Sequence, residues 1–357
     1  MRSPSLSRVI LALAFVAAAL LGTGCSYEWL FPNTEMTTVH PETDATRLIQ
    51  EVYVPITWIM IVIFVVVEAL LLYTILRFRK RRGDDSIPEQ IHGNTAMEIG
   101  WTLIPVVIVV LLAFPTLRNL WALAEPPEGS DPMVIKVTGK QWWWEFEYPE
   151  EIGVVTANEL HLPVGKTVRL ELTSDNVIHS FWVPRLSGKR DLVPGRTQSI
   201  WFTPEKAGMY YGQCAELCGA SHALMKFRVI VDEPGDFAQW AANERSAVAG
   251  SMTDPGPAAM LAGGCVACHK IDFPGSPFQQ RLGPILTHIG SRTTIAAGIL
   301  DNTPENMAHW IKYSPEVKPG STMPCHRMPT EDDPAEGCVP VSDENLQTIV
   351  AYLQSLK

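Results

Sequence analysis

Four side chains that bind soft metal ions lie close together in residues 214–225: Cys214, Cys218, His222 and Met225. Thiolate and thioether ligands of this kind favour copper. A mononuclear copper site needs only one cysteine, so the second cysteine, four residues after the first, allows two sulfurs to bridge two metal ions. His179, at the end of a predicted β-strand, is placed to supply a second imidazole. These residues predict a dinuclear copper site.

Two other readings of the cysteine pair remain. Cys214 and Cys218 could form a disulfide in an exported domain. They could also bind zinc together with two histidines, but Met225 would then have no role.

A second motif, Cys265-Val-Ala-Cys268-His269, has the spacing at which haem c is attached covalently. Its two thiols add to the vinyl groups of the haem, and the histidine that follows is placed to bind the iron. The motif predicts one covalent haem c.

The remaining cysteines suggest processing and cross-linking. Cys325 and Cys338 close a short loop, for which a disulfide is the simplest account in an oxidising compartment. Residues 1–25 resemble a signal peptide with a basic start, an apolar stretch and a small-residue cleavage site. Cys25 at the end of this segment resembles a bacterial lipidation site, with a spare thiol as the alternative.

Two apolar stretches, 52–76 and 97–120, are long enough to span a membrane. The basic cluster at 77–82 places the end of the first span in the cytoplasm, so the chain returns outward through the second span. Everything from about residue 125 is therefore expected outside the cytoplasm. Glu68 lies inside the first span, where we expect it to pack against another subunit.

Beyond the spans, short β-type runs separated by turns predict a β-sandwich over 125–232. A polar linker is expected at 233–250, and a last domain at 251–357 has an amphipathic helix pattern near its end. The predicted fold is therefore multi-domain, with a two-helix transmembrane hairpin inside 26–124, a β-sandwich and an all-α domain.

The chain from the first span to about residue 231 resembles subunit II of cytochrome c oxidase. The likeness is carried by the copper segment and by residues 98–101, 114–118, 139–144 and 189–196. It implies a cupredoxin fold. It also implies a dinuclear CuA centre whose ligands are His179, Cys214, the backbone carbonyl of Glu216, Cys218, His222 and Met225.

The same resemblance implies roles for three further groups. The Glu216 carboxylate would reach a Mg or Mn ion at the boundary with subunit I. Trp142 matches an exposed tryptophan through which electrons reach CuA, although tryptophans here could also serve packing. Glu98 matches a glutamate near the entrance of a proton pathway, with a helix N-terminal acid favoured by the dipole as the alternative.

The last domain resembles class I cytochrome c in residues 282–284 and 318–324. In that family a proline after glycine supports the proximal histidine, and a methionine before proline is the distal ligand. The resemblance thus assigns Pro284 and Met323. Met328 is a rival distal ligand, whereas His288 and His309 are expected to be ordinary surface or core histidines.

Taken together, the resemblances imply subunit II of a haem–copper oxidase with a fused cytochrome c. Electrons would pass from an external donor to haem c, then to CuA, then to haem a in subunit I. Subunits I and III are the implied partners, and the donor could be a cytochrome c, an iron–sulfur protein or a quinol-oxidising complex. The implied location is the bacterial inner membrane, with the soluble domains on the periplasmic side.

Composition restricts the remaining classes. The net charge of −10 disfavours nucleic acid and favours basic partners. A nitrous or nitric oxide reductase, a stand-alone electron carrier and a copper-delivery or sensor protein remain as rivals. The two spans argue against the first of these, and the fused haem domain argues against the last.

Overall fold

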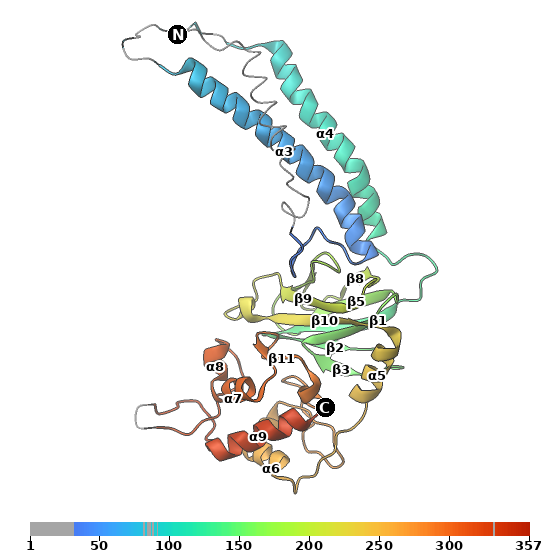
Figure 1. Cartoon of the computed structure of the whole chain (residues 1–357), viewed down its shortest axis with the longest axis vertical. Helices are drawn as coiled ribbons and strands as arrows, with labels where there is room; N and C mark the ends of the chain where they lie inside the picture. Colours follow the sequence, from blue (N-terminus) through green and yellow to red (C-terminus); the bar gives the residue numbers. More distant parts are fainter. Residues whose placement is uncertain (1–31, 81–82, 84–86, 88, 91, 331–332) are drawn as a thin grey trace. The chain divides into compact units, whose positions relative to one another are not determined.

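A computed structural model describes residues 32–80, 83, 87, 89–90, 92–330 and 333–357 of the protein (Figure 1). These residues form two compact units, and residues 41–46 and 123–357 belong to the second. The predicted signal peptide, Cys25 and the basic residues Arg81 and Arg82 lie outside the described residues.

The first unit consists mainly of two long helices, α3 (Asp44–Phe78) and α4 (Thr95–Ala122), drawn in blue and cyan in Figure 1. Their most apolar windows have mean hydropathies of 2.8 and 2.3, so both could cross a membrane. Both extend beyond the predicted spans because polar turns at their ends remain helical. Arg118 near the end of α4 pairs with Glu51 on α3.

The β-sandwich consists of two five-stranded sheets, whose strand orders are β3-β2-β1-β5-β8 and β4-β10-β9-β6-β7. Strands β1 and β5 pair in parallel, as do β4 and β10, whereas the other pairs are antiparallel. The β-type runs of the sequence form strands β1, β2, β4, β5, β8, β9 and β10, and β3, β6 and β7 are additional. The bounds are β1 Met133–Lys140, β2 Trp143–Glu147, β3 Val155–Ala157, β4 Glu159–Pro163, β5 Val168–Ser174, β6 His179–Trp182, β7 Arg190–Leu192, β8 Gln198–Phe202, β9 Gly208–Cys214 and β10 Lys226–Asp232.

Aromatic side chains fill the core of the sandwich. Trp144 on β2, Phe181 on β6 and Phe227 on β10 are fully buried, and their rings contact one another. Buried apolar residues alternate with less buried ones along β5, as expected for a strand with one face in a core. This packed core fixes the strand ends at which candidate ligands are placed.

The segment predicted as a polar linker contains a helix, α5 (Pro234–Glu244). Phe237 belongs to the core of the sandwich, and Trp240 stacks on His161 with ring centroids 4.3 Å apart. This helical part of the predicted linker therefore packs on the sandwich, with Phe237 buried and Trp240 partly buried there.

The last domain has its own apolar core and is mainly helical. Its helix α9 matches the predicted amphipathic segment, while a small sheet of β11 and β12 departs from the all-α expectation. Its elements are α6 Pro255–Ala262, η2 Cys265–Ala267, η3 Ile289–Ser291, β11 Thr294–Ile295, β12 Leu300–Asp301, α7 Pro304–Lys312, α8 Ser314–Val317 and α9 Asp343–Ser355.

Within the second unit, the last domain contacts the sandwich through buried polar groups. Glu159 on β4 is 3% exposed, and its Oε1 accepts hydrogen bonds from the backbone N–H groups of Thr293 and Thr294 at 2.8 and 3.0 Å. The hydroxyl groups of both threonines donate to the same oxygen. Arg281 forms an ion pair with Glu145 on β2 at 3.1 Å.

Candidate metal and haem sites

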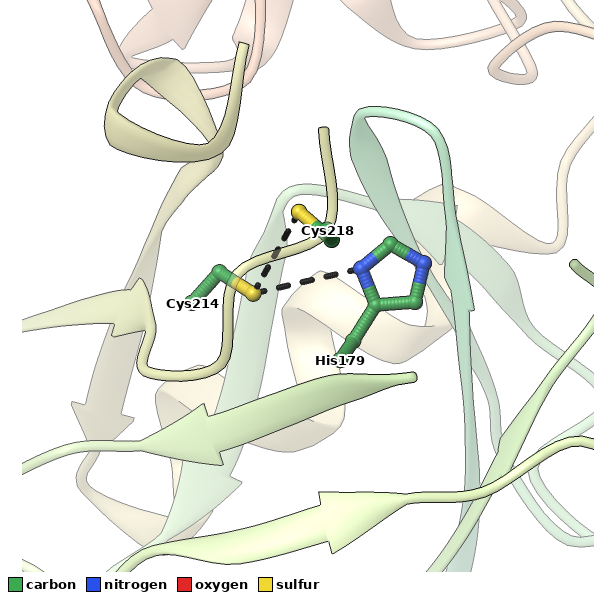
Figure 2. A group of neighbouring side chains, drawn as sticks. All are labelled: His179, Cys214 and Cys218. Atoms are coloured by element: carbon green, nitrogen blue, oxygen red, sulfur yellow. Dashed lines mark hydrogen bonds between the residues drawn. The ribbon is translucent and has the colours of Figure 1, made fainter. Parts of the chain in front are cut away.

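The predicted copper ligands come together where three strands of one sheet end or begin. Strand β9 ends at Cys214, β6 begins at His179, and the loop between β9 and β10 carries Cys218. The Cys214 Sγ atom lies 3.7 Å from Cys218 Sγ and 3.9 Å from His179 Nδ1 (Figure 2). These three side chains form a buried cluster able to hold a metal ion.

The other predicted ligands surround the same sulfur pair. Cys218 Sγ lies 3.6 Å from His222 Nδ1 and 3.9 Å from Met225 Sδ. The backbone carbonyl of Glu216 lies 3.3 Å from the Cys214 Sγ. The two sulfurs thus contact each other, and each of the other four predicted donor groups contacts one of them.

The geometry distinguishes between the alternative readings of the cysteine pair. A disulfide requires about 2.05 Å between the sulfurs, and both cysteines are free in the structure. Two imidazole nitrogens would complete a zinc site, but Met225 Sδ is also directed at the pair and is fully buried. A set of two thiolates, two imidazoles, a thioether and a carbonyl fits copper better than zinc.

The two thiols interact strongly in the absence of a cation. The hydrogen bond with Cys218 lowers the pKa of Cys214 to about 3, because it stabilises the thiolate. The same bond, together with burial, raises the pKa of Cys218. The pair therefore favours one thiolate, and a bound cation would favour the thiolate form of both sulfurs, as ligation requires.

Two residues that the sequence did not assign orient the first imidazole. His179 Nε2 lies 3.0 Å from Asn176 Oδ1, so an N–H donated there leaves Nδ1 free to face the sulfurs. Gly139 on β1 packs against the ring, and a Cβ at this position would lie 2.8 Å from His179 Cδ2. A sequence signal for Asn176 was available, because it lies three residues before the candidate ligand His179.

Trp142 is buried, which corrects the expectation that it is exposed. Its side chain is 9% exposed, and its Nε1 donates to the carbonyl of Cys218 at 3.1 Å. Gly320 of the last domain lies against the ring, so closely that a Cβ there would be 2.7 Å from Trp142 Cη2. The last domain covers the surface that would otherwise be exposed.

The haem-attachment motif is arranged around a fixed histidine. Cys265 begins the short helix η2, and Cys265 and Cys268 are free and partly exposed. His269 Nδ1 donates to the carbonyl of Pro284 at 2.7 Å, which leaves Nε2 to bind iron. Burial lowers the pKa of His269 and so favours the neutral imidazole that ligation needs. These residues fit a covalent haem.

Met323 is placed better than its rival to be the distal ligand. It is partly buried against the core of the last domain, and its carbonyl accepts a hydrogen bond from Ser314 Oγ at 3.0 Å. Met328 is 51% exposed. His288 is buried and bonded to the carbonyl of Ser246, and His309 is exposed, as expected for core and surface histidines.

Cys325 and Cys338 are joined by a disulfide in the structure. The bridge lies directly after the segment that carries Met323. The backbone N–H of Val339 donates to the carbonyl of Cys325 at 2.8 Å, which ties the two ends of the loop together a second time.

Glu98 lies in the first turn of α4 and has a structural role there. Its carboxylate accepts a hydrogen bond from the backbone N–H of Asn94 at 3.3 Å, and Asn94 Oδ1 accepts one from Met97 N at 3.2 Å. This reciprocal pair caps the helix. The contacts favour the helix-terminal alternative, and the proton-pathway role of Glu98 stays a prediction.

Known families match three parts of the chain. Residues 43–119 match "Cytochrome C oxidase subunit II, transmembrane domain", residues 151–232 match "Cytochrome C oxidase subunit II, periplasmic domain" and residues 254–357 match "Cytochrome c". The matched ranges cover most of the two long helices, strands β3 to β10 of the sandwich, and the haem-motif domain.

Whole-chain relatives have the same order of parts. A protein of Alkalihalophilus pseudofirmus named cytochrome c oxidase subunit 2 is 35% identical over 97% of this chain and 96% of its own length. One of Bacillus subtilis with the same name is 31% identical over 98% of both. Among solved structures, the periplasmic domain of subunit II of cytochrome oxidase from Bradyrhizobium japonicum is 35% identical, with a TM-score of 0.32, and covers 34% of this chain and 97% of that one.

Proposed function

This chain belongs to the cytochrome c oxidase subunit 2 family, and we propose that it receives electrons at a haem c and passes them through Trp142 to CuA. As a subunit of this kind it forms part of a haem–copper oxidase complex, in the membrane and with subunit I. The observation that carries the proposal is the meeting of four further donor groups, two imidazoles, a thioether and a carbonyl, around the sulfur pair of Cys214 and Cys218.

In the proposed electron transfer through copper, the protein holds the donor groups in fixed positions. Copper held by this set would supply one-electron chemistry. His179 and Met225 are fully buried, and Asn176 and Gly139 restrict the orientation of the first imidazole. A donor set fixed by strand ends and packing changes little between oxidation states, so it favours fast electron transfer.

In the haem domain, Cys265 and Cys268 would attach the haem, and His269 and Met323 would bind its iron. Iron with histidine and methionine ligands has a raised reduction potential, which suits a carrier near the oxidising end of a respiratory chain. The Pro284 carbonyl holds the orientation of His269 by accepting its Nδ1–H.

The resemblance to subunit II suggests further partners, and one of them concerns the copper loop. The Glu216 side chain is exposed although its carbonyl faces Cys214. We place this carboxylate at a Mg or Mn ion on the boundary with subunit I. Subunit III is a further partner in the complex. The electron donor is a cytochrome c, an iron–sulfur protein or a quinol-oxidising complex. The complex lies in the bacterial inner membrane. Glu98 stands at the start of α4 as the candidate proton-pathway residue.

Rapid reduction of the purified oxidase complex tests this order of electron transfer. After anaerobic mixing with a reduced donor, the haem c absorption should change first and the CuA absorption second, and oxygen should be consumed once it is admitted. Reduction of copper ahead of haem c would contradict the proposal. So would a complex that consumes a nitrogen oxide and not oxygen.

A further inference from the structure

A lysine of the segment 318–324, to which the sequence assigned no role of its own, bridges the two redox domains. Lys318 is 4% exposed and lies between α8 and Met323. Its Nζ donates to the carbonyl of Trp142 in the sandwich and, at 3.2 Å, to the carbonyl of Ala296 in the last domain. We propose that Lys318 is a positioning residue, which holds the loop of the haem methionine against Trp142 for electron transfer to copper.

The two residues after Lys318 also contact the sandwich, at the loop that carries the copper ligands and at Trp142. The carbonyl of Pro319 accepts a hydrogen bond of 2.6 Å from Ser221 Oγ, next to the copper ligand His222. Gly320 has a φ of +80°, and its backbone lies against the Trp142 ring. Three consecutive residues of the haem domain therefore contact the copper loop and its tryptophan.

On the copper side, hydrogen bonds connect Trp142 to Cys218, a candidate copper ligand. Trp142 Nε1 and Gln141 Nε2 both donate to the carbonyl of Cys218, at 3.1 and 2.7 Å. A Cβ on Gly219 would lie 3.0 Å from the Trp142 ring, so the loop is also packed against it. A displacement of Trp142 would break its bond to Cys218.

On the haem side, hydrogen bonds connect Lys318 to Met323, the proposed distal ligand. The backbone N–H of Ser321 donates to the carbonyl of Lys318 at 3.0 Å, and Ser321 Oγ accepts from the N–H of Met323 at 3.3 Å. A hydrogen-bonded route thus runs from Met323 through residues 318–321 and Trp142 to Cys218. Lys318 is the side chain that joins its two halves.

Burial of the lysine also indicates a specific role. A buried amine is costly unless its hydrogen bonds are made, and here both acceptors are main-chain carbonyls of different domains. Burial lowers the pKa of Lys318 to about 7, and the amine keeps N–H donors for both carbonyls whether or not it is protonated. Its bonds would be lost if the domains separated.

This role rests on the proposed function, and the test separates the two. In the purified oxidase complex, a photoexcited ruthenium dye gives one electron to haem c on a light flash, a sacrificial amine re-reduces the dye, and the electron's arrival at CuA is followed by absorption. Lys318→Met should slow this step by about tenfold or more, because the contact loses two bonds. The haem spectrum and the copper paramagnetic resonance should be unchanged, which a general loss of folding would not allow.

Lys312→Met is the matched control. Lys312, also in the haem domain, pairs with Asp343 on the surface, and this variant should transfer at the wild-type rate. Gly320→Ala tests the same contact from the loop side, because its Cβ would displace the Trp142 ring, and it too should be slow. If Lys318→Met does not assemble, Lys318→Gln replaces it with the same expectation.

The outcomes decide between the two claims. A wild-type complex in which haem c never reduces CuA would refute the proposed function. A wild-type complex that transfers normally, with a Lys318 variant that transfers equally fast and has both centres intact, would refute only the role of Lys318.

Discussion

At the copper site, the chemistry resides in two sulfurs 3.7 Å apart and in the neutral donors around them. Residue types and spacing were enough to predict the five side-chain donors, because the ligand chemistry depends on the residue types. The backbone carbonyl of Glu216 followed only from the resemblance to subunit II. The orientation of the donors was not predictable in this way. Asn176 and Gly139 act through contacts with His179 that exist only after the strands have paired.

Removal of one imidazole should affect copper alone. His179→Ala deletes a fully buried donor at the sulfur pair, so we expect loss of the CuA absorption while the haem c spectrum remains. Visible spectra of the purified complex measure both. An unchanged copper band would mean that His179 is not a ligand.

The complementary change should affect haem alone. Met323→Ala removes the proposed distal sulfur, and the haem should lose its methionine-ligated spectrum and shift to a lower potential, with copper retained. Met328→Ala is the control, because Met328 is 51% exposed, and its spectrum should match the wild type. The reverse pattern would assign the iron to Met328.

Among the secondary-structure elements, short β-type runs between turns predicted most strands, and the length of two apolar stretches predicted the two long helices. Strands β3, β6 and β7 were missed because each is too short to show a pattern in sequence. The exposure of Trp142 was predicted wrongly for a different reason. The residues that cover it, Lys318 and Gly320, are far away in sequence and only docking of the last domain brings them there.

Docking of the haem domain on β4 should depend on one carboxylate. Glu159→Ala leaves the N–H and hydroxyl groups of Thr293 and Thr294 without their acceptor, at a cost of about 1–3 kcal/mol. We expect faster hydrogen exchange at these two amides. Glu150→Ala, at an exposed position of the same domain, is the control. Equal protection in both variants would contradict the docking role.

For the whole molecule, the main consequence is that the sandwich and the haem domain form one compact unit. The tryptophan next to copper is covered by the haem domain, so a soluble donor has the haem and not Trp142 as its target. The chain's net charge of −10 favours a basic donor.

Salt should therefore separate the two electron-transfer steps. Reduction of haem c by a basic soluble cytochrome should slow by about tenfold or more from low to high ionic strength, because exposed charges are screened. Transfer from haem c to CuA should not change, since Lys318 and Glu159 make their contacts in buried positions. Stopped-flow and flash measurements over the same salt series give both rates. Equal salt dependence would argue against a docked haem domain.

The central claim is that Cys214 and Cys218 hold two coppers that share one electron. Paramagnetic resonance of the oxidised complex tests it most directly, through the hyperfine pattern of the copper signal. We expect the pattern of an electron spread equally over two copper nuclei, and we expect this signal to be lost in Cys218→Ser. A pattern from a single copper nucleus, or no copper signal from a fully loaded complex, would contradict it.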